Sequence, residues 1–232
     1  MWNWKNRAIT FSFDDAVTQD ERAIEILNKY GLKATFNINS SLLGLLGSLG
    51  QGANLTNHNK IKASKLKELY KGHEVAVHTL THPNLTTLDE ETIIRQVEED
   101  RLKLSELCGY EVVGMAYPCG GVNNDDRVAK IIKEHTGVKY SRTITSTYNF
   151  DLQENLYRFN PSVHTAEEKL FETVEKFLSV KTDKPQILYV WGHTYEMDMP
   201  SVPFSWEDFE KLCKLLSGKE DVFYGTNKEV LL

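Results

Sequence analysis

The nine-residue stretch RAITFSFDD, residues 7–15, decides the fold. Its β-branched and aromatic residues predict a strand from Arg7 to Asp14. The tetrapeptide Thr18-Gln19-Asp20-Glu21 predicts a capping box, followed by a helix that runs through Tyr30. A second strand is predicted from Lys33 to Asn39. This strand–helix–strand order requires parallel strands joined by a crossover helix.

The same alternation continues to the end of the chain. Further strands are predicted at Glu74 to His78, Val112 to Pro118, Lys139 to Thr145, Leu156 to Phe159, Gln186 to Trp191 and Val222 to Tyr224. Further helices are predicted at Ser64 to Lys71, Asp89 to Cys108, Asp125 to His135, Thr165 to Val180 and Ser205 to Leu216. Seven or eight such units favour a closed or nearly closed (β/α) barrel over an open doubly wound sheet. No glycine-rich nucleotide-binding loop follows the first strand. The sequence therefore predicts an α/β fold with a single domain over residues 1–232.

Composition places the chain among ordinary globular proteins. Its 232 residues include 27 basic and 33 acidic ones, and the basic residues are scattered, which argues against a nucleic-acid-binding protein. No apolar run approaches the roughly 18 residues that span a bilayer. The N-terminal residues lack the basic-then-apolar pattern of a signal peptide, so a cytoplasmic location is expected. Cys108, Cys119 and Cys213 are widely spaced, which predicts reduced thiols.

Polar residues follow four of the predicted strands at their C-terminal ends. These clusters are Asp14-Asp15, His78 to His82, Pro118 to Gly121 and Gly192-His193. The C-terminal ends of parallel strands meet on one face of a barrel, where active sites are built. We therefore expect residues that are far apart in the sequence to share one pocket.

His78 and His82 are four residues apart, so both imidazoles can face one metal ion. Two histidines and one carboxylate form a catalytic zinc set that leaves a coordination position open for water. Of Asp14 and Asp15, one can be the carboxylate ligand of the metal and the other can accept a proton from the water. The alternatives are two ordinary loop histidines and a carboxylate pair in a turn or helix cap.

His193 follows an apolar strand and is a candidate general acid, because histidine titrates near neutrality. Glu196, three residues on, can raise the pKa of His193 or orient its ring. A purely structural histidine is the alternative.

The segment Tyr117-Pro118-Cys119-Gly120-Gly121 ends the fourth strand with proline and glycines. Exposed backbone N–H groups in such a loop can stabilise an oxyanion, although a simple turn has the same composition. A nucleophilic Cys119 is disfavoured, because no histidine is linked to it in the sequence.

Two apolar regions allow more than one interpretation. SLLGLLGSLG, residues 41–50, favours a short buried helix, and the alternative is a flap or contact surface at the barrel mouth. The aromatic residues after the last long strand can stack on sugar rings or pack in the core; they are Trp191, Tyr195, Phe204 and Trp206.

At these residues the chain resembles the polysaccharide deacetylase family, carbohydrate esterase family 4. Thr10 to Ala16 (TFSFDDA) is similar to its first motif, TFDDG, with Ala16 in place of the glycine. His78 to His82 (HTLTH) matches its H-[ST]-x-x-H motif. Ile187 to His193 (ILYVWGH) is similar to its last motif, a strand that ends in the catalytic histidine.

The resemblance implies a distorted (β/α) barrel of about seven parallel strands. It also implies that Asp14 is the general base and His193 the general acid. Asp15, His78 and His82 become the ligands of Zn²⁺ or of another divalent ion such as Co²⁺, Ni²⁺ or Mn²⁺.

Two motifs of that family are not matched. The third, R-x-P-x-G, here begins with Ala116, so the arginine that steadies the catalytic aspartate is missing, and Arg142 near the end of the next strand is a candidate replacement. The fourth, an aspartate and tryptophan pair that supports the catalytic histidine, has no clear counterpart. His164 and Glu196 are candidate substitutes.

The predicted function is that of a metal-dependent hydrolase that removes N-acetyl or O-acetyl groups from a carbohydrate oligomer or polymer. The oxyanion is expected beside Tyr117, Pro118, Cys119 and Gly120, with the Cys119 N–H as its donor. One alternative is a hydrolase of a small or cyclic non-sugar amide. Another is a non-catalytic, metal-retaining sugar-binding barrel, which the missing arginine at position 116 supports. The natural substrate and the oligomeric state stay open.

Overall fold

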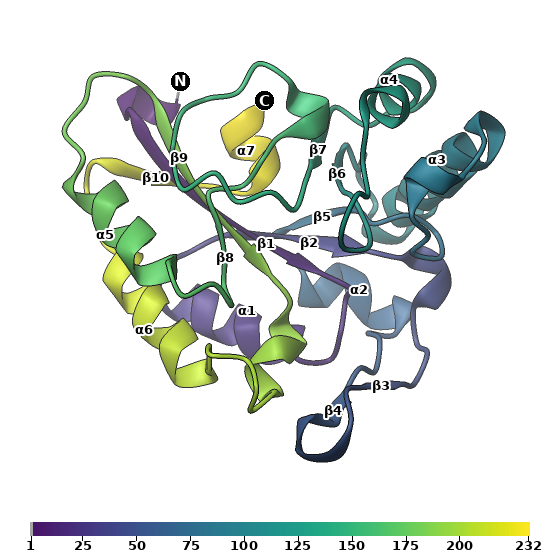
Figure 1. Ribbon diagram of the computed structural model, residues 1–232, viewed down its shortest axis with the longest axis horizontal. Helices are drawn as coiled ribbons and strands as arrows, with labels where there is room; N and C mark the ends of the chain where they lie inside the picture. The colour runs from purple at the N-terminus through teal and green to yellow at the C-terminus, as the bar shows by residue number, and fades with distance from the viewer. Residues whose placement is uncertain (1) are drawn as a thin grey trace.

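Strand β1, Arg7–Asp14, lies at the centre of a curled parallel sheet in the computed structural model, which describes residues 2–232 (Figure 1). One side of β1 pairs along almost its whole length with β9, Gln186–Gly192. The other side pairs first with β10, Val222–Tyr224, and then with β2, Ala34–Ile38. The predicted bounds of β1 are therefore confirmed, and it is buried along nearly its full length because neighbours cover it on all sides.

The parallel sheet curls so that the short segment of residues 159–162 reaches from one edge towards the other. From edge to edge its strands are β7 (Tyr140–Arg142), β6 (Gly114–Ala116), β5 (Glu74–Val77), β2, β1, β9 and β8 (Val163–His164). The Phe159 backbone bonds to Ser141 and Thr143 around β7, and the Ser162 N–H donates to the Tyr189 carbonyl of β9. This segment bridges the two edges, so the predicted distorted (β/α) barrel is confirmed.

Alternation along β1 decides which side chains face the barrel interior. Phe11 and Phe13 pack outward, where both rings contact Phe209 on α6. Thr10 and Ser12 point inward and take part in hydrogen bonds with Asn227. Asp14 continues the inward series at the C-terminal end of the strand.

Helices cover the outside of the barrel (Figure 1). They are α1 (Asp20–Lys29), α2 (Ala63–Leu69), α3 (Glu90–Cys108), α4 (Asp126–His135), α5 (Leu170–Ser179) and α6 (Trp206–Leu216). In α4, for example, Val128, Ile131 and Ile132 are buried, and the Asp125 carboxylate caps the helix by accepting from the Val128 N–H at 2.7 Å. No helix within residues 2–232 combines the length and the apolar composition that a bilayer crossing needs.

Short elements complete the chain. The 3₁₀ helices are η1 (Trp2–Trp4), η2 (Ser40–Leu42), η3 (Gly52–Asn54), η4 (Leu85–Thr87), η5 (Leu156–Arg158) and η6 (Thr194–Asp198). A small antiparallel hairpin joins β3 (Ser48–Leu49) to β4 (Thr56–Asn57). Helix α7, Asn227–Leu231, was not predicted; its Val230 packs against Ala8 and Tyr189, so it fills the end of the barrel opposite the strand C-termini.

Three local predictions were wrong. Helix α1 begins at Asp20 without a side-chain cap, because the Thr18 N–H pairs with the Asn59 carbonyl and Gln19 is already in a helical conformation. Leu156 to Phe159 is not a strand. Its turn starts where the Asn155 side chain accepts from the Tyr157 N–H, and the edge strand β8 follows later.

The leucine-rich segment is also not a buried helix. Beyond the single turn η2 it runs as an exposed loop into the short strand β3, since Gly44 and Gly50 have φ values of +82° and +81° that leave the helical region. The three cysteines are free thiols, as predicted.

Candidate active site

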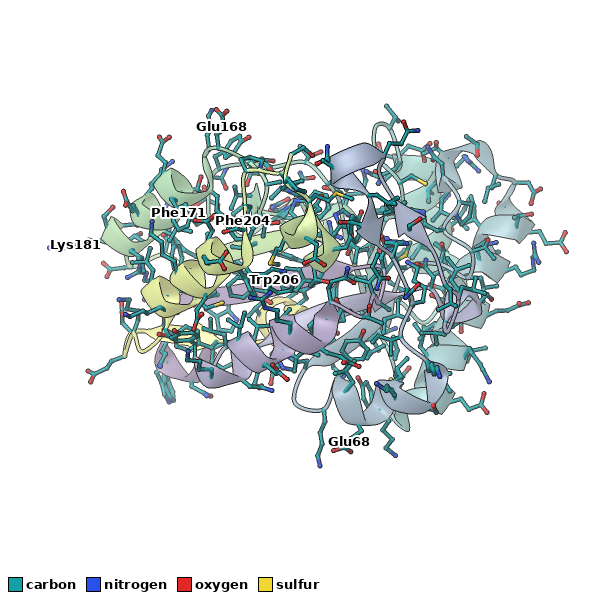
Figure 2. All side chains as sticks on the ribbon, turned by 90° about the horizontal axis from the view of Figure 1, so that it is seen from below. Glu68, Glu168, Phe171, Lys181, Phe204 and Trp206 are labelled. Carbon is teal, nitrogen blue, oxygen red and sulfur yellow. The ribbon has the colours of Figure 1, made fainter. Side chains whose placement is uncertain are left out.

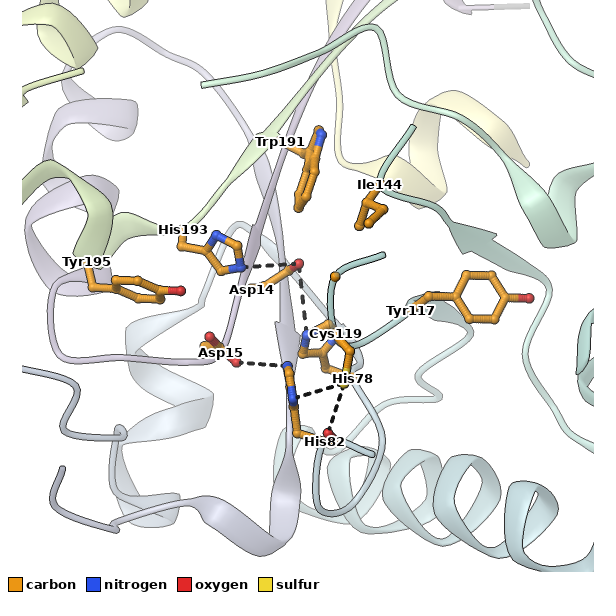
Figure 3. Close-up of a pocket in the computed structure, with 11 residues that line it drawn as sticks. Asp14, Asp15, His78, His82, Tyr117, Cys119, Ile144, Trp191, His193 and Tyr195 are labelled. Atoms are coloured by element: carbon orange, nitrogen blue, oxygen red, sulfur yellow. Dashed lines mark hydrogen bonds and ion pairs between the residues drawn. The ribbon is translucent and has the colours of Figure 1, made fainter. Parts of the chain in front are cut away.

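Five polar residues from three strand ends gather at one cavity on the C-terminal face of the barrel (Figure 3). Asp14 ends β1 and Asp15 follows it, His78 and His82 follow β5, and His193 follows β9. The cavity has a volume of about 260 Å³. Its lining consists of Asp14, Asp15, His78, His82, Tyr117, Cys119, Gly120, Ile144, Trp191, His193 and Tyr195.

Asp15, His78 and His82 present one ligand atom each within 4.8 Å of the others. His78 Nδ1 lies 2.9 Å from the Ala116 carbonyl oxygen, which can only accept, so Nδ1 carries the proton and Nε2 presents its lone pair. Burial lowers the pKa of His78 to about 4, so the ring is neutral at pH 7. His82 Nε2 lies 3.7 Å from Asp15 Oδ1. Two imidazoles and a carboxylate are donors that suit zinc and related divalent ions.

The backbone around this trio is held in left-handed conformations. The φ angle is +85° at Asp15, +52° at Ala16, +62° at His82 and +69° at Cys119. Such values are uncommon outside glycine, and Ala16 stands where the first motif of the resembled family has glycine. Conformations of this kind cluster at functional sites, where the surrounding structure fixes them.

Asp14 is only 2% exposed and is held by two donors. Arg142 Nη2 donates to both carboxylate oxygens, at 2.6 and 2.5 Å, and Asn37 Nδ2 donates to Oδ1 at 2.7 Å. Burial alone would raise the pKa of Asp14, but Arg142, aided by His78 and His193, holds it below its ordinary value. Asp14 is therefore ionised near neutral pH.

Arg142 reaches Asp14 from the strand beside the position where the third motif has its arginine. Ala116 on β6 pairs in register with Arg142 on β7. The Arg142 side chain is fully buried, and its guanidinium carbon lies 4.3 Å from the centroid of the Trp191 ring. The guanidinium that pairs with the carboxylate at the end of β1 thus comes from β7, and not from the neighbouring position on β6.

His193 flanks Asp14 from the β9 side. Its Nε2 lies 4.0 Å from Asp14 Oδ2, and its Nδ1 lies 3.2 Å from Glu196 Oε1. Burial lowers the pKa of His193, but Glu196 and the two aspartates raise it to about 9. The imidazole is therefore protonated at neutral pH, while the carboxylate of Asp14 beside it is ionised.

His164, at the end of β8, contacts the same glutamate. Its Nδ1 accepts from the Ala166 N–H at 3.0 Å, so its ring proton sits on Nε2, which lies 3.5 Å from Glu196 Oε2. His164, His193 and Glu196 also have ligand atoms within 4.8 Å of one another. In this tautomer the His164 Nε2 that faces Glu196 carries a proton and has no lone pair for a metal. The His164, His193 and Glu196 cluster is therefore arranged to hold protons rather than a metal ion.

Two further residues contact Asp15 and were not predicted. His58 Nε2 lies 3.3 Å from Oδ2, and Lys60 Nζ lies 2.8 Å from the Asp15 carbonyl oxygen and 3.4 Å from Oδ1. Burial would raise the pKa of Asp15, but His58, with His193 and Lys60, holds it well below its usual range. Both residues follow the β3–β4 hairpin in an irregular segment without a motif, so the sequence offered no signal for them.

The loop after β6 supplies only part of the predicted oxyanion wall. The Tyr117 N–H donates to the Arg142 carbonyl, its hydroxyl donates to the Tyr157 carbonyl, and Pro118 has no N–H to offer. Within residues 2–232, the backbone N–H groups of Cys119 and Gly120 have no hydrogen-bond partner. Cys119 and Gly120 also line the cavity, so their N–H groups are available to a substrate oxygen.

The four aromatic residues in the last part of β9 and after it divide into two pairs. Trp191 and Tyr195 line the cavity, and Ile144, which the sequence did not single out, lies beside Trp191 (Figure 3). Phe204 and Trp206, both labelled in Figure 2, are buried. Their rings pack with that of Phe209 in α6. Core packing therefore accounts for the second pair.

Known proteins resemble this chain in sequence. The sequence profile of the polysaccharide deacetylase family matches residues 3–140. Peptidoglycan-N-acetylglucosamine deacetylase PgdA of Listeria monocytogenes serotype 1/2a is 28% identical over 120 residues, which are 51% of this chain and 22% of that protein. The match therefore covers about a fifth of the length of this curated relative.

Solved structures resemble the fold. A family 4 carbohydrate esterase from Streptomyces lividans, in complex with acetate, has a TM-score of 0.56 at 14% identity, over 95% of this chain and 93% of that one. A family 4 pseudoenzyme from Bacillus anthracis has a TM-score of 0.56 at 20% identity, over 99% of this chain and 66% of that one. At these identities the likeness concerns the fold alone.

Proposed function

This chain belongs to the polysaccharide deacetylase family, and on that premise we propose that it is a metal-dependent hydrolase that removes acetyl groups from a carbohydrate oligomer or polymer. One observation carries the proposal. An ionised Asp14 and a protonated His193 lie 4.0 Å apart beside the Asp15, His78 and His82 trio. Neighbouring groups whose pKa values are pushed apart in this way are suited to act as base and acid in one reaction.

The trio fits a divalent ion by its chemistry. It combines two imidazole nitrogens and one carboxylate oxygen, and a set of three protein ligands leaves a coordination position for water or substrate. Zn²⁺ suits such donors, and Co²⁺, Ni²⁺ and Mn²⁺ accept them as well. When bound, the ion polarises the substrate carbonyl and lowers the pKa of water.

Asp14 and His193 move the protons. Asp14 accepts a proton from the water that attacks the acetyl carbonyl, and Arg142 and Asn37 fix the orientation of the carboxylate for that step. The Cys119 N–H donates to the carbonyl oxygen as negative charge develops on it. His193 Nε2 donates its proton to the departing nitrogen or oxygen, and acetate and a free amine or hydroxyl result.

A non-catalytic sugar-binding barrel is the second candidate. The Bacillus anthracis neighbour is described as a pseudoenzyme, and this chain lacks the third-motif arginine at position 116. Arg142 restores a guanidinium to Asp14, and a binding protein has no need of a base and an acid beside a metal trio. We therefore favour catalysis, with a small or cyclic non-sugar amide as the alternative substrate.

The test is acetate release from N-acetylglucosamine oligomers by the purified protein, with zinc and then with a chelator. We expect release that the chelator abolishes and added zinc restores. Bound metal without release from N- or O-acetylated sugars would favour the binding protein or the other amide. A protein that binds no divalent metal would contradict the proposal.

A further inference from the structure

A second cavity of about 430 Å³ adjoins the candidate active site. Asp15, His82 and Tyr195 line both cavities, so the two lie side by side. The rest of its wall is built mainly by the segment before α2, which projects from the barrel with the β3–β4 hairpin (Figure 1). These remaining lining residues are Leu42, Leu45, Leu46, Gly47, Leu49, His58 and Lys60.

The leucines of this wall are anchored to the active site by backbone hydrogen bonds. The Gly44 N–H donates to the Ile61 carbonyl at 2.9 Å, the Lys60 N–H to the Leu45 carbonyl at 2.8 Å, and the His58 N–H to the Gly47 carbonyl at 2.9 Å. His58 and Lys60 are the residues whose side chains contact Asp15. The same short ladder therefore places the leucines and holds the carboxylate of the metal trio.

These leucines are exposed in a chain that buries most of its large apolar residues. Leu45 is 54% exposed, Leu46 84% and Leu49 36%. Residues 40–59 contain no lysine, arginine, aspartate or glutamate, although such residues make up 26% of the chain. An exposed apolar patch of this kind marks a binding surface, and its lack of charge disfavours a strongly charged partner.

We propose that this leucine cavity binds an apolar group of the substrate, an alkyl or aryl substituent close to the scissile acetyl group. The proposal rests on the proposed function, and it adds that the preferred substrates are amphiphilic. The shared lining points to the occupant, because a group that contacts Leu45 and Leu49 in this cavity lies next to Asp15 and His82 of the trio. Trp191 and Ile144 line the first cavity only, so the two cavities can hold different parts of one molecule.

The test uses methyl, butyl and octyl β-glycosides of N-acetylglucosamine, each below its micelle-forming concentration. We expect kcat/KM to rise about tenfold from methyl to octyl through a lower KM, since the longer chain buries more apolar surface. The double variant Leu45→Ser/Leu46→Ser should remove most of that rise and leave the methyl glycoside rate unchanged. Leu102→Ser on α3 is the matched control, because Leu102 is 53% exposed and lies outside both cavities.

A binding measurement tests this inference independently of the proposed catalytic activity. Calorimetry on the zinc-loaded Asp14→Asn variant, in which turnover is strongly slowed, compares the affinities of the same three glycosides. Tighter binding of the octyl glycoside, lost with the leucine pair, supports the cavity even if the wild type releases no acetate. Equal affinities and equal kcat/KM values for all three glycosides would overturn it. So would leucine variants that change only the oligomeric state or the recruitment to phosphatidylcholine vesicles.

Discussion

The two sides of the candidate active site are built differently. On the base side, Asp14, Arg142 and Asn37 all belong to strands, and each is at most 2% exposed. On the acid side, the His193 and Glu196 side chains are 20% and 17% exposed, and both follow β9 in a short turn.

The difference also extends to the backbone. Asp15 and Ala16, next to the base, have positive φ values, whereas His193 has an extended conformation with a φ of −126°. A buried charge pair on strands fixes one geometry and one charge, while a histidine in a turn with a partly exposed carboxylate can change its protonation. We therefore expect substitutions on the base side to cost stability and rate together, and substitutions on the acid side to change mainly the pH dependence.

Arg142→Met tests the base side most severely. It leaves the Asp14 carboxylate buried without its counter-ion, so we expect a loss of roughly 3–5 kcal/mol in the free energy of unfolding at pH 7 and the loss of nearly all activity. In the wild type the lowered pKa of Asp14 adds stability above the ordinary carboxyl pKa. In the variant that pKa rises instead, so the deficit should grow from pH 4 to pH 7. Urea unfolding at the two pH values measures it.

The register of β6 and β7 offers a control for this loss. Ala116 pairs with Arg142, so the double variant Ala116→Arg/Arg142→Met moves the guanidinium to the neighbouring strand. We expect part of the stability and activity to return. A double variant no better than Arg142→Met would show that only the β7 position can support Asp14.

Asp14→Asn removes the base and keeps most of the volume. Its metal content should stay near that of the wild type, because Asp14 is not in the trio, while turnover falls by roughly a hundredfold or more. His82→Gln is the contrasting variant and should lose metal affinity as well as rate. Elemental analysis beside acetate release distinguishes the two. Full activity of Asp14→Asn would contradict its assignment as the base.

Glu196→Gln tests the acid side. Glu196 raises the pKa of His193, which reaches about 9, and a general acid must be protonated. Without Glu196 that pKa falls, so the alkaline limb of kcat/KM should move down by about one pH unit, with roughly tenfold loss at the alkaline end and little change near pH 6. Glu207→Gln removes the same charge at an exposed site and should leave the profile unchanged. A uniform loss at all pH values would instead indicate a structural role for Glu196.

On both sides of the site, residues that follow a strand or belong to a motif could be predicted from the sequence, and Glu196 beside His193 is one of them. The apolar pattern of residues 7–14 predicted β1 and placed Asp14 at its C-terminal end. Arg142 could be proposed because it lies near the end of the strand after the one that carries Ala116, and these two strands are neighbours in the parallel sheet. The contacts of His58 and Lys60 with Asp15 could not be foreseen. They depend on how an irregular segment folds back over the barrel, and such a segment has no periodicity to reveal its path.

Ala16→Gly tests the smallest contribution, the backbone strain beside the base. Glycine should relieve roughly 1 kcal/mol of strain at a φ of +52°. It also removes a buried methyl group and increases the conformational entropy of the unfolded chain, and both effects are destabilising. The net change in the free energy of unfolding should therefore lie within about 1 kcal/mol of zero. Ala23→Gly in α1 is the matched control, because Ala23 is equally buried but has helical geometry and gains no such relief. Urea unfolding should therefore show Ala23→Gly to be the more destabilising by about 1 kcal/mol. Equal losses would mean that Ala16 is unstrained, and the rigidity of the base side would then rest on the hydrogen bonds from Arg142 and Asn37 to Asp14.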